Sequence, residues 1–595
     1  MLWDPADAPP ADGPLDPPAV PAVPSSLTAA QVHAFSEGRL HEAFGAGFER
    51  ARTHTRSPRI PSGRMCLLHE ITHIDPHGGP QGRGYLRAVW RVSPDDWFFD
   101  GHFKDDPCMP GTLMADATLQ ALAVYMSAMG FSLTRDGWRF EPVAGAKYTF
   151  RCRGQAVPTS RELVYEIFVH EISAGPEPTV YADLLCTVDG LKAFQCGRMG
   201  LRLVPDWPLE AKPERLAPRH EPSAVVVGGI PLDSAAMLAC AWGRPSKAMG
   251  PAFAASDGPR RVPRLPGPPY LMVSRVVRLD AQTGVIEPDA SVEIEYDVPP
   301  DAWYFAAHGQ ASMPFGVLME IGLQPCGWLA SYVGIHLPVR EELFFRNLDG
   351  TGTVRRVGPD AGVIRTQTRL LSVSRSGGMA IESFDVVCRI GDEAVFTFTT
   401  SFGHFLEEAL AQQVGLPTTD ADRDRVALPS DLTLDLARLD GPIGMPSPPL
   451  LMVDAISGWW PHAGAAGLGR LRATKNVRAE EWFFKSHFFQ DPVQPGSLGV
   501  DALLQLLRAY AVARGLPSRF REPRLESPAV DRPITWKYRG QVRPWNETIV
   551  LEVEVTAVEE TPEATSIVAD GWLWVDGLRI YQVKDLSIRL YEEDR

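Results

Sequence analysis

The stretch that decides the fold is WFFDGHFKDDPCMPGTLMAD, residues 97–116, with the apolar run that continues it to Met129. His102 lies in a segment that contains two prolines, and a Pro-Gly step at Gly111 marks the start of a helix. Along this helix apolar residues occupy every side, and Asp116 is the only charge. A helix that is apolar all round is normally enclosed by other structure. The stretch therefore predicts a buried central helix preceded by a histidine loop.

The residue types in this stretch suit acid–base chemistry. A lone acid on a buried helix is costly to ionise, so Asp116 is a candidate general acid. The imidazole of His102 is the natural base. The first amides of the helix, at Gly111 and Thr112, have no intrahelical acceptor and could polarise a thioester carbonyl. Gln120 follows Asp116 by one turn and would share its face.

A single loop histidine and a single helical acid are more often structural than catalytic. The evidence for a catalytic role is that the same pattern occurs three times in the chain. The pattern Trp, aromatic, Phe, two residues, His occurs at 97–102, 303–308 and 482–487. The acid follows the histidine by 14 residues in the first and third copies and by 12 in the second. Each acid is followed four residues later by glutamine, in the pairs Asp116 and Gln120, Glu320 and Gln324, and Asp501 and Gln505. This repetition favours a functional reading of the first and third copies.

The second copy departs from the pattern. Phe315 stands where the others have glycine, and Pro325 interrupts the helix after Gln324. Loss of the glycine puts an oxyanion site in doubt. We therefore expect this copy to be mainly structural, with His308 and Glu320 as the weaker catalytic candidates.

The repeat extends well beyond the motif. A Pro-bounded apolar strand begins 36, 37 and 36 residues before the three motif tryptophans, at Pro61, Pro266 and Pro446. Runs of alternating apolar residues with Gly-Asp or Asp-Gly turns follow the helices of the first and third copies, which indicates antiparallel hairpins. One long helix and a set of long strands, in units of about 150 residues, predict an α+β fold in which an antiparallel sheet wraps the helix. The predicted organisation is a flexible Pro/Ala-rich linker at 1–25, unit 1 at 26–205, a linker with short helices at 206–260, unit 2 at 261–410, a linker at 411–442 and unit 3 at 443–595.

Composition narrows the function classes. The chain has 595 residues and a net charge of −15, so nucleic acid is an unfavourable partner. Its eight cysteines show no C-x-x-C or other metal-ligand spacing, which predicts free thiols in a reducing cytoplasm and no metal site. The most apolar helices carry an acid and are too short to favour a membrane span.

The motif itself resembles a known family. Residues 101–117 match the signature Gly-His-Phe-x-x-Asp-Pro-x-Met-Pro-Gly-x-Leu-x-x-Asp-Ala throughout, and the third copy departs at Ser486 and Gln494. This signature is similar to that of the hot-dog dehydratases of fatty-acid synthesis, of the bacterial 3-hydroxydecanoyl-carrier-protein dehydratase/isomerase type. The chain resembles even more the tandem dehydratase regions of polyunsaturated fatty acid synthases. The resemblance is good over 60–205 and 445–592 and weak over 262–405. It implies three tandem hot-dog units, with at least one pair forming a double hot-dog.

The resemblance also implies an activity, the dehydration of a 3-hydroxyacyl thioester to an enoyl thioester without a cofactor. The same histidine could also isomerise the new double bond from trans to cis. Carried over by position, the bases are His102 and His487, the acids Asp116 and Asp501, the oxyanion donors Gly111 and Gly496, and the other substrate contacts Thr112, Gln120, Ser497 and Gln505.

In such folds the histidine of one unit is completed by the acid of its partner. We expect units 1 and 2 to pair, so that Glu320 serves His102. Unit 3 is expected to pair with its own copy in a homodimer, so that Asp501 of one chain serves His487 of the other. The expected partners are an acyl carrier protein and other synthase domains. Two other functions are a non-catalytic scaffold and an acyl thioesterase, and the complete Met-Pro-Gly motif with Asp116 favours the dehydratase over the thioesterase.

Overall fold

The structure is a computed structural model, and it describes residues 13–592 apart from residues 55, 208–221, 259, 311, 431, 437, 438, 440 and 442. The chain divides into two compact units, Met1–Trp207 and Pro208–Arg595. Each is described by itself. Within the described residues, none of the helices is both long enough and apolar enough to cross a membrane.

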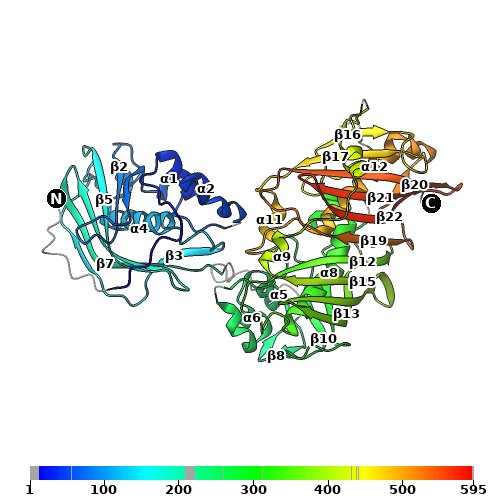
Figure 1. The fold of residues 1–595 in the computed structure, drawn as a ribbon, viewed down its shortest axis with the longest axis horizontal. Helices are drawn as coiled ribbons and strands as arrows, with labels where there is room; N and C mark the ends of the chain where they lie inside the picture. The colour runs from blue at the N-terminus through cyan, green and yellow to red at the C-terminus, as the bar shows by residue number, and fades with distance from the viewer. Residues whose placement is uncertain are drawn as a thin grey trace. The chain divides into compact units, whose positions relative to one another are not determined.

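The first unit encloses one long helix, α4 (Gly111–Ala128), in a seven-stranded antiparallel sheet (Figure 1). The sheet order is β1-β2-β5-β6-β7-β3, and β4 pairs with β7. Tyr125 and Leu122 of the helix are fully buried against the sheet, as expected for an apolar helix. The strands are β1 (Glu70–Asp75), β2 (Tyr85–Arg91), β3 (Trp138–Pro142), β4 (Thr149–Cys152), β5 (Glu162–Ser173), β6 (Thr179–Val188) and β7 (Leu191–Pro205), and the short helices are α1 (Ala29–Ser36), α2 (Leu40–Phe44) and α3 (Phe98–Gly101).

The segment before α1 differs from the expected flexible linker. Leu15 pairs with Ile172 at the end of β5, Val20 is buried, and the Ala19 amide donates to the Met129 carbonyl. Residues 13–25 are therefore packed on the first unit, because their few apolar side chains reach its core. The rest of the expected linker, residues 1–12, lies outside the described residues.

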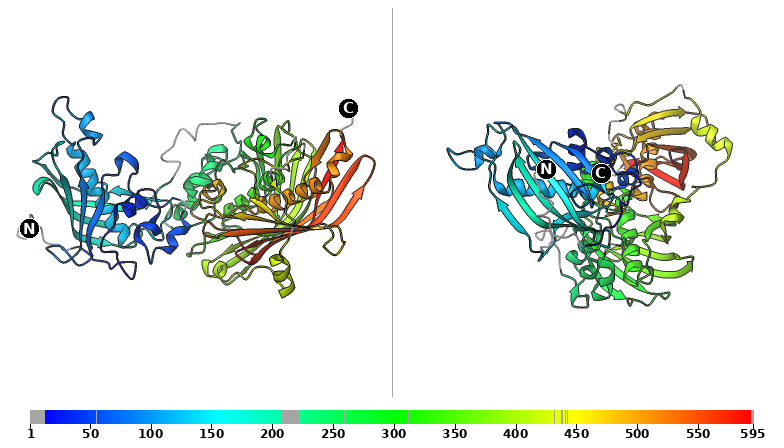
Figure 2. Two further views of the ribbon diagram at one scale, coloured as in Figure 1. Left: turned by 90° about the horizontal axis from the view of Figure 1, so that it is seen from above. Right: turned by 60° about the vertical axis from the view of Figure 1, so that its left-hand side comes forward.

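The second unit holds two long helices, α8 (Phe315–Tyr332) and α12 (Gly496–Ala513), within one 13-stranded antiparallel sheet. The strands curve around the helices, as Figure 2 shows. The sheet order is β10-β11-β13-β14-β15-β12-β19-β22-β21-β20-β17-β16, and β18 pairs with β22. The strands are β10 (Arg275–Asp280), β11 (Ser291–Asp297), β12 (Phe344–Val354), β13 (Val363–Ser376), β14 (Met379–Ile390), β15 (Glu393–Phe405), β16 (Ala455–Trp460), β17 (Arg470–Asn476), β18 (Pro523–Glu526), β19 (Pro533–Tyr538), β20 (Thr548–Glu560), β21 (Ala564–Val575) and β22 (Leu578–Glu592).

The large sheet joins the second and third copies of the repeat. Strand β12 of the second copy pairs with β19 of the third, Asp349–Thr353 against Pro533–Lys537. Trp536 lies on this seam, is 1% exposed and donates to the Asn347 side chain. The expected pairing of the first copy with the second is therefore wrong, because strand β12 of the second copy pairs with the third copy.

Each copy has the same order of elements: two strands, a short helix, an 18-residue helix and further strands. The loop before each long helix is held in the same way, since Met109, Met313 and Gln494 donate backbone hydrogen bonds to Ala156, Val357 and Val542. The short helices before the second and third long helices are α7 (Trp303–His308) and α11 (Trp482–Ser486).

The expected linker between the first and second copies is largely part of a core. Its helices α5 (Ser234–Trp242) and α6 (Pro245–Met249) bury Met237 and Ala248 with the second unit, and β8 (Val226–Val227) and β9 (Ile230–Pro231) form a small hairpin. The later linker contains α9 (Glu407–Ala411) and α10 (Asp420–Ala427).

Candidate active site

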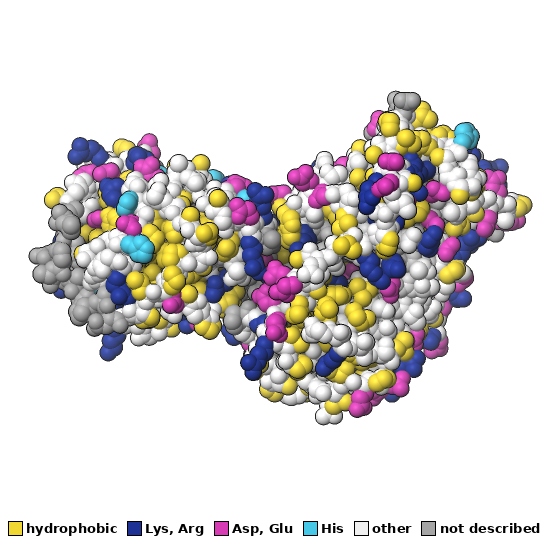
Figure 3. Space-filling view, viewed as in Figure 1, with side chains coloured by type: hydrophobic (Ala, Val, Ile, Leu, Met, Phe, Trp, Pro, Cys, Tyr) yellow, Lys and Arg dark blue, Asp and Glu magenta, His cyan; other side chains and the backbone are white. Residues whose placement is uncertain are grey.

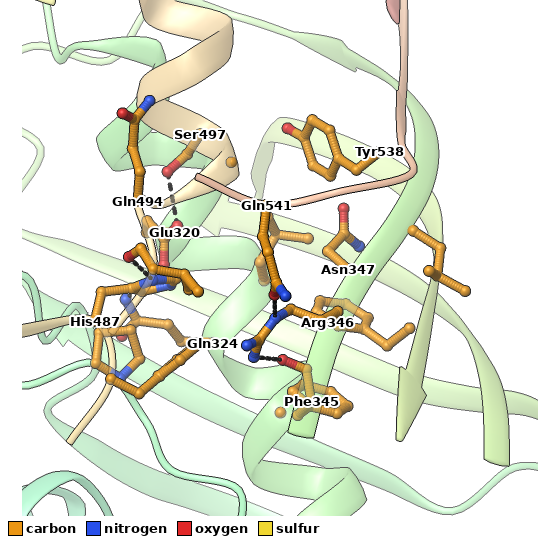
Figure 4. Close-up of a pocket in the computed structure, with 18 of the residues that line it drawn as sticks. Glu320, Gln324, Phe345, Arg346, Asn347, His487, Gln494, Ser497, Tyr538 and Gln541 are labelled. Atoms are coloured by element: carbon orange, nitrogen blue, oxygen red, sulfur yellow. Dashed lines mark hydrogen bonds between the residues drawn. The ribbon is translucent and has the colours of Figure 1, made fainter. Parts of the chain in front are cut away.

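A cavity in the second unit brings together side chains from α8, the loop after α11, α12, β12 and β19 (Figure 4). It encloses about 840 Å³ of space not filled by protein atoms, including the part open to solvent. His487 and Glu320 both line it, although they come from different copies of the repeat. The other lining residues that matter below are Leu323, Gln324, Gly327, Phe345, Arg346, Phe402, Gly496, Ser497, Tyr538 and Gln541.

His487 lies at the end of α11, and its ring is held by the loop that follows. Nδ1 lies 3.1 Å from the Val493 carbonyl oxygen. A carbonyl only accepts, so Nδ1 carries the proton and Nε2 keeps its lone pair. Burial lowers the pKa of His487 to about 3. The ring is therefore neutral at physiological pH and able to accept a proton.

Glu320 projects from the second turn of α8. One carboxyl oxygen accepts from the Ser497 hydroxyl at 2.7 Å, and the other accepts from the Gln324 amide at 2.9 Å. Burial raises the pKa of Glu320, although these two hydrogen bonds oppose the shift. Burial thus favours the protonated carboxyl of Glu320 and the neutral imidazole of His487, so the carboxyl can act as the acid and the imidazole as the base.

The start of α12 supplies a third feature of the cavity. The backbone N–H groups of Gly496 and Ser497 are the first of the helix and have no acceptor among the described residues. The buried ring of Tyr538 packs on Gly496, where a Cβ would meet Cε2 of the ring at 2.8 Å. Only glycine fits this close approach, which leaves the amides open to the cavity.

An ion pair between the two copies holds the histidine loop. Arg346 of β12 donates to both carboxylate oxygens of Asp491, at 2.6 and 2.7 Å, and also bonds the Gln541 side chain. Burial alone would raise the pKa of Asp491, but the Arg346 guanidinium outweighs it and holds that pKa below its ordinary value. Bidentate pairs of this kind fix geometry as well as charge.

The reciprocal pair, His308 with Asp501, forms no comparable site. Arg508 lies between them, with Nη2 3.0 Å from Nε2 of His308. Asp501 accepts from the Gly316 amide at 3.1 Å, so the helix amide is already used. Burial raises the pKa of Asp501 to about 7, opposed by Arg508, and burial lowers the pKa of His308 well below its ordinary value. The expectation that Asp501 serves His487 across a homodimer is therefore not met, since the acid in the His487 cavity is Glu320 of the same chain.

The first unit carries the same groups in a more exposed setting. Nδ1 of His102 lies 2.8 Å from the Cys108 carbonyl, the counterpart of the Val493 contact. Burial raises the pKa of Asp116, and Gln120 donates to its carboxyl at 2.7 Å. No hydrogen bond or ion pair between His102 and Asp116 is present in the described part of this unit. Thr112, at the start of α4, is exposed.

The glutamines after the acids have one structural role in all three copies. Gln120, Gln324 and Gln505 each accept from a backbone amide, at 2.9, 2.8 and 3.0 Å, and each donates to a backbone carbonyl two residues earlier, at 2.8, 2.8 and 2.9 Å. They tie the Pro-bounded segment to the helix. Both ends of these buried side chains are occupied by protein groups, so the structure gives them a positioning role.

Sequence reasoning missed three groups around the cavity. Arg346 comes from a different copy than Asp491, so no local spacing points to it. Tyr538 is found only through its packing on Gly496. The third missed group is Tyr270, which lies 3.3 Å from the Ser497 hydroxyl. Ser497 itself is predicted as a substrate contact, but its hydroxyl donates to Glu320. These contacts depend on how the second and third copies pair.

Comparison with known proteins is consistent with this arrangement. A family model described as a FabA-like domain matches residues 60–196 and 445–584. The chain is 28% identical over 674 aligned residues to a polyunsaturated fatty acid synthase subunit of Thraustochytrium sp., and the alignment covers 89% of this chain and 44% of that protein. The chain thus spans less than half the length of this relative.

Solved structures also align with the chain, at low similarity. A dehydratase domain from the CurJ module of curacin polyketide synthase is 12% identical, with a TM-score of 0.32, covering 54% of this chain and 97% of that one. A protein of Lactobacillus plantarum assigned as an oleoyl thioesterase is 11% identical, with a TM-score of 0.29, covering 52% of this chain and 98% of that one.

The middle copy lies outside the matched regions, so its assignment as a third hot-dog unit stays a prediction. The two matched regions fall in different compact units of the structure, and each contains one complete histidine loop and central helix. Residues 60–196 and 445–584 thus each match the FabA-like family model, and most of the chain is similar to part of a polyunsaturated fatty acid synthase subunit.

Proposed function

We propose that the protein is a 3-hydroxyacyl thioester dehydratase and that its best-formed site is the cavity between His487 and Glu320. The observation that carries this proposal is the convergence of a neutral imidazole, a carboxyl with a raised pKa and a free helix amide on one cavity. The family match and the synthase homologue agree with a dehydratase-type role.

The geometry assigns each group a step. Nε2 of His487 takes the proton from the carbon next to the thioester carbonyl. The amide of Gly496 holds the carbonyl oxygen as negative charge develops there, which is usually the largest catalytic contribution. Glu320 gives its proton to the departing β-hydroxyl, so that water leaves as the carbon–carbon double bond forms. Transfer of the proton from His487 back to Glu320 then restores the site.

The substrate would arrive on an acyl carrier protein, as the homology to a fatty acid synthase suggests. The proposal includes trans-to-cis isomerisation as a second reaction. The neutral imidazole of His487, once regenerated, can remove a proton from the γ-carbon of the bound enoyl chain and return it to the α-carbon, which moves the double bond from C2–C3 to C3–C4. Substrate-dependent formation of a 3-cis product would separate the two activities.

The direct test is to measure dehydration of 3-hydroxyacyl thioesters by the parent and by His102→Ala, His487→Ala and the double variant. We expect each single variant to lose part of the activity and the double variant to lose all of it. His462→Ala is the matched control, because this histidine is exposed on a loop of the same unit. Full activity in the double variant would reject the proposal.

A second site would form on the first unit if another copy of it supplied the acid. Phe150 of strand β4 is 49% exposed, and Tyr148, just before this strand, is 50% exposed. The corresponding residues of the third copy are Trp536 and Ile534, each 1% exposed beneath β12. Hydrophobic side chains also gather on the face of this unit shown in Figure 3. We propose that two chains form a homodimer through this surface, in which His102 of one chain works with Asp116 of the other.

Mixing of variants tests this composite site. Chains with His102→Ala and chains with Asp116→Asn, both carrying His487→Ala, should be inactive alone. A random mixture of their dimers should regain about a quarter of the first-unit activity, because half of the dimers keep one complete site out of two. No recovery on mixing, together with a monomeric mass, would reject the homodimer.

A further inference from the structure

The two central helices of the second unit are equivalent but present different side chains to their cavities. Both helices have 18 residues, and the contact of Ser497 with Glu320 has its counterpart in the contact of Gly316 with Asp501. One face of α8 lines the open cavity. Its residues are Glu320, Leu323, Gln324 and Gly327, and the corresponding residues of α12 are Asp501, Leu504, Gln505 and Arg508. The two faces differ most in their last member, glycine in one and arginine in the other.

Arg508 fills its half of the interface. Its side chain is 2% exposed, bonds His308 and reaches towards the Gly444 carbonyl at 3.5 Å. Glu320, Leu323, Gln324 and Gly327 of α8 all line the cavity of about 840 Å³. None of the four corresponding residues of α12 lines the smaller pocket, of about 320 Å³, that contains Phe315. Phe315 stands at the position that glycine occupies in α12. The buried side chain of Arg508 thus stands at the helix position where α8 has only Gly327.

Gly327 leaves the corresponding space open in the other half. Apolar side chains that line the cavity together with Gly327 include Leu323, Phe345 and Phe402. The rings of Phe345 and Phe402 are stacked with centroids 4.7 Å apart, and Phe384 packs against Phe402 from the edge. A Cβ on Gly327 would meet Cε1 of Phe345 at 3.1 Å. The ring is backed by other rings and has little room to yield, so any larger side chain at 327 must take space from the cavity.

We propose that Gly327 determines the length of acyl chain that the His487–Glu320 site accepts. The inference rests on the proposed function and names the part of the cavity that holds the chain. A chain that starts at Glu320 and follows this face of α8 passes Gly327 seven residues later, about 10 Å along the helix. Its apolar tail would lie on Leu323 and the two stacked rings. The first unit has Ala123 at the same position of α4, so the two sites would differ in length preference.

The experiment compares Gly327→Ala and Gly327→Val with the parent, all in a His102→Ala background. Substrates are 3-hydroxyacyl-pantetheine thioesters of four, eight and twelve carbons. We expect kcat/KM for the four-carbon substrate to stay within about twofold, and the twelve-carbon to four-carbon ratio to fall at least tenfold in the valine variant. The alanine variant only adds the methyl group that α4 already has, so its twelve-carbon to four-carbon ratio should lie between those of the parent and the valine variant. Equal loss at all lengths, or an unchanged ratio in the valine variant, would overturn the proposal.

Binding of saturated acyl-pantetheine thioesters, measured by calorimetry on the same proteins, separates this inference from the proposed reaction. Suppose that the parent shows no turnover but binds long chains more tightly than short ones, and that the valine variant loses this preference. That result would reject the dehydratase proposal and support the role of Gly327. Turnover by the parent, with the same chain-length profile in all variants, would support the dehydratase proposal and reject the role of Gly327. Thermal unfolding of each variant confirms that the fold is retained.

Discussion

At the scale of single residues, burial sets the protonation of the two groups that share the cavity. An imidazole taken out of water is easier to keep neutral, and a carboxyl taken out of water is easier to keep protonated. Burial therefore shifts both His487 and Glu320 towards the forms that a dehydration needs. The hydrogen bond to the Val493 carbonyl then fixes which ring nitrogen of His487 faces the reaction.

The pH dependence of kcat/KM follows from these shifts. With the pKa of His487 at about 3, the base stays unprotonated through the mildly acidic range, so a His102→Ala protein should lose no activity when the pH is lowered from 7 to 5. On the alkaline side activity should fall as Glu320 loses its proton, above its ordinary pKa because burial raises it. A loss of activity centred near pH 6.5 on the acid side would show an exposed, ordinary histidine instead.

Gly496→Ala should impair catalysis without unfolding the protein. The added methyl would meet Cε2 and Cζ of Tyr538 at 2.8 and 2.9 Å, so the helix start or the ring must shift. Displacing an oxyanion donor costs roughly 10²- to 10³-fold in kcat. Steady-state kinetics in a His102→Ala background measure the loss, and the melting temperature reports the fold. An unchanged kcat would remove this amide from the mechanism.

At the scale of elements, the paired strands and central helices determine that a cavity forms around His487 and Glu320 and not around His308 and Asp501. The pairing of β12 with β19 places α8 against α12. The side-chain contacts differ between the two ends of this helix pair. At one end Ser497 holds Glu320 and the amides of α12 stay free. At the other, Asp501 takes the Gly316 amide and Arg508 fills the space. The middle copy thus contributes the acid of a site whose base comes from the third copy.

The Arg346–Asp491 pair should stabilise this contact measurably. Removing one partner of a largely buried pair leaves the other charge unpaired and typically costs about 3–5 kcal/mol. Arg346→Met should therefore lower the free energy of unfolding by about 3 kcal/mol. Adding Asp491→Asn should recover part of it, since the orphaned charge is gone. Urea unfolding of the two single variants and the double variant measures the coupling, and strictly additive losses would contradict a specific pair.

Much of this arrangement can be predicted from local sequence. The apolar run and the Pro-Gly step predict the start of α4 at Gly111, and the same Pro-Gly step recurs where α12 begins at Gly496. The repeated histidine and acid positions identify both complete motifs. Which copies pair cannot be predicted in this way, because Trp536 and Gly350 reveal their contact only in the fold. The assignment of Glu320 to His487 depends on that pairing, and so do Arg346 and Tyr538.

At the scale of the whole molecule, the chain consists of two compact units with separate cores. One core surrounds α4, and the other surrounds α8 and α12 together. Each unit is large enough to unfold cooperatively by itself. The net charge of −15 favours solubility, and on the face shown in Figure 3 acidic and basic side chains are interspersed.

Calorimetry should therefore resolve two unfolding transitions. Leu122→Ala removes a fully buried side chain from α4 and should cost about 2–5 kcal/mol in the first unit only. Leu506→Ala, the matched change in α12, should shift only the other transition by a similar amount. A single transition that moves in both variants would show that the two units unfold together.

The central claim is that His487 works with Glu320 of the same chain and not with Asp501. It is tested most directly by the kcat/KM of Glu320→Gln and Asp501→Asn, each in a His102→Ala background. We expect Glu320→Gln to lower kcat/KM for dehydration by at least about 10²-fold, the usual contribution of a general acid, and Asp501→Asn to retain most of the activity. Loss in the Asp501 variant with activity preserved in the Glu320 variant would contradict the account.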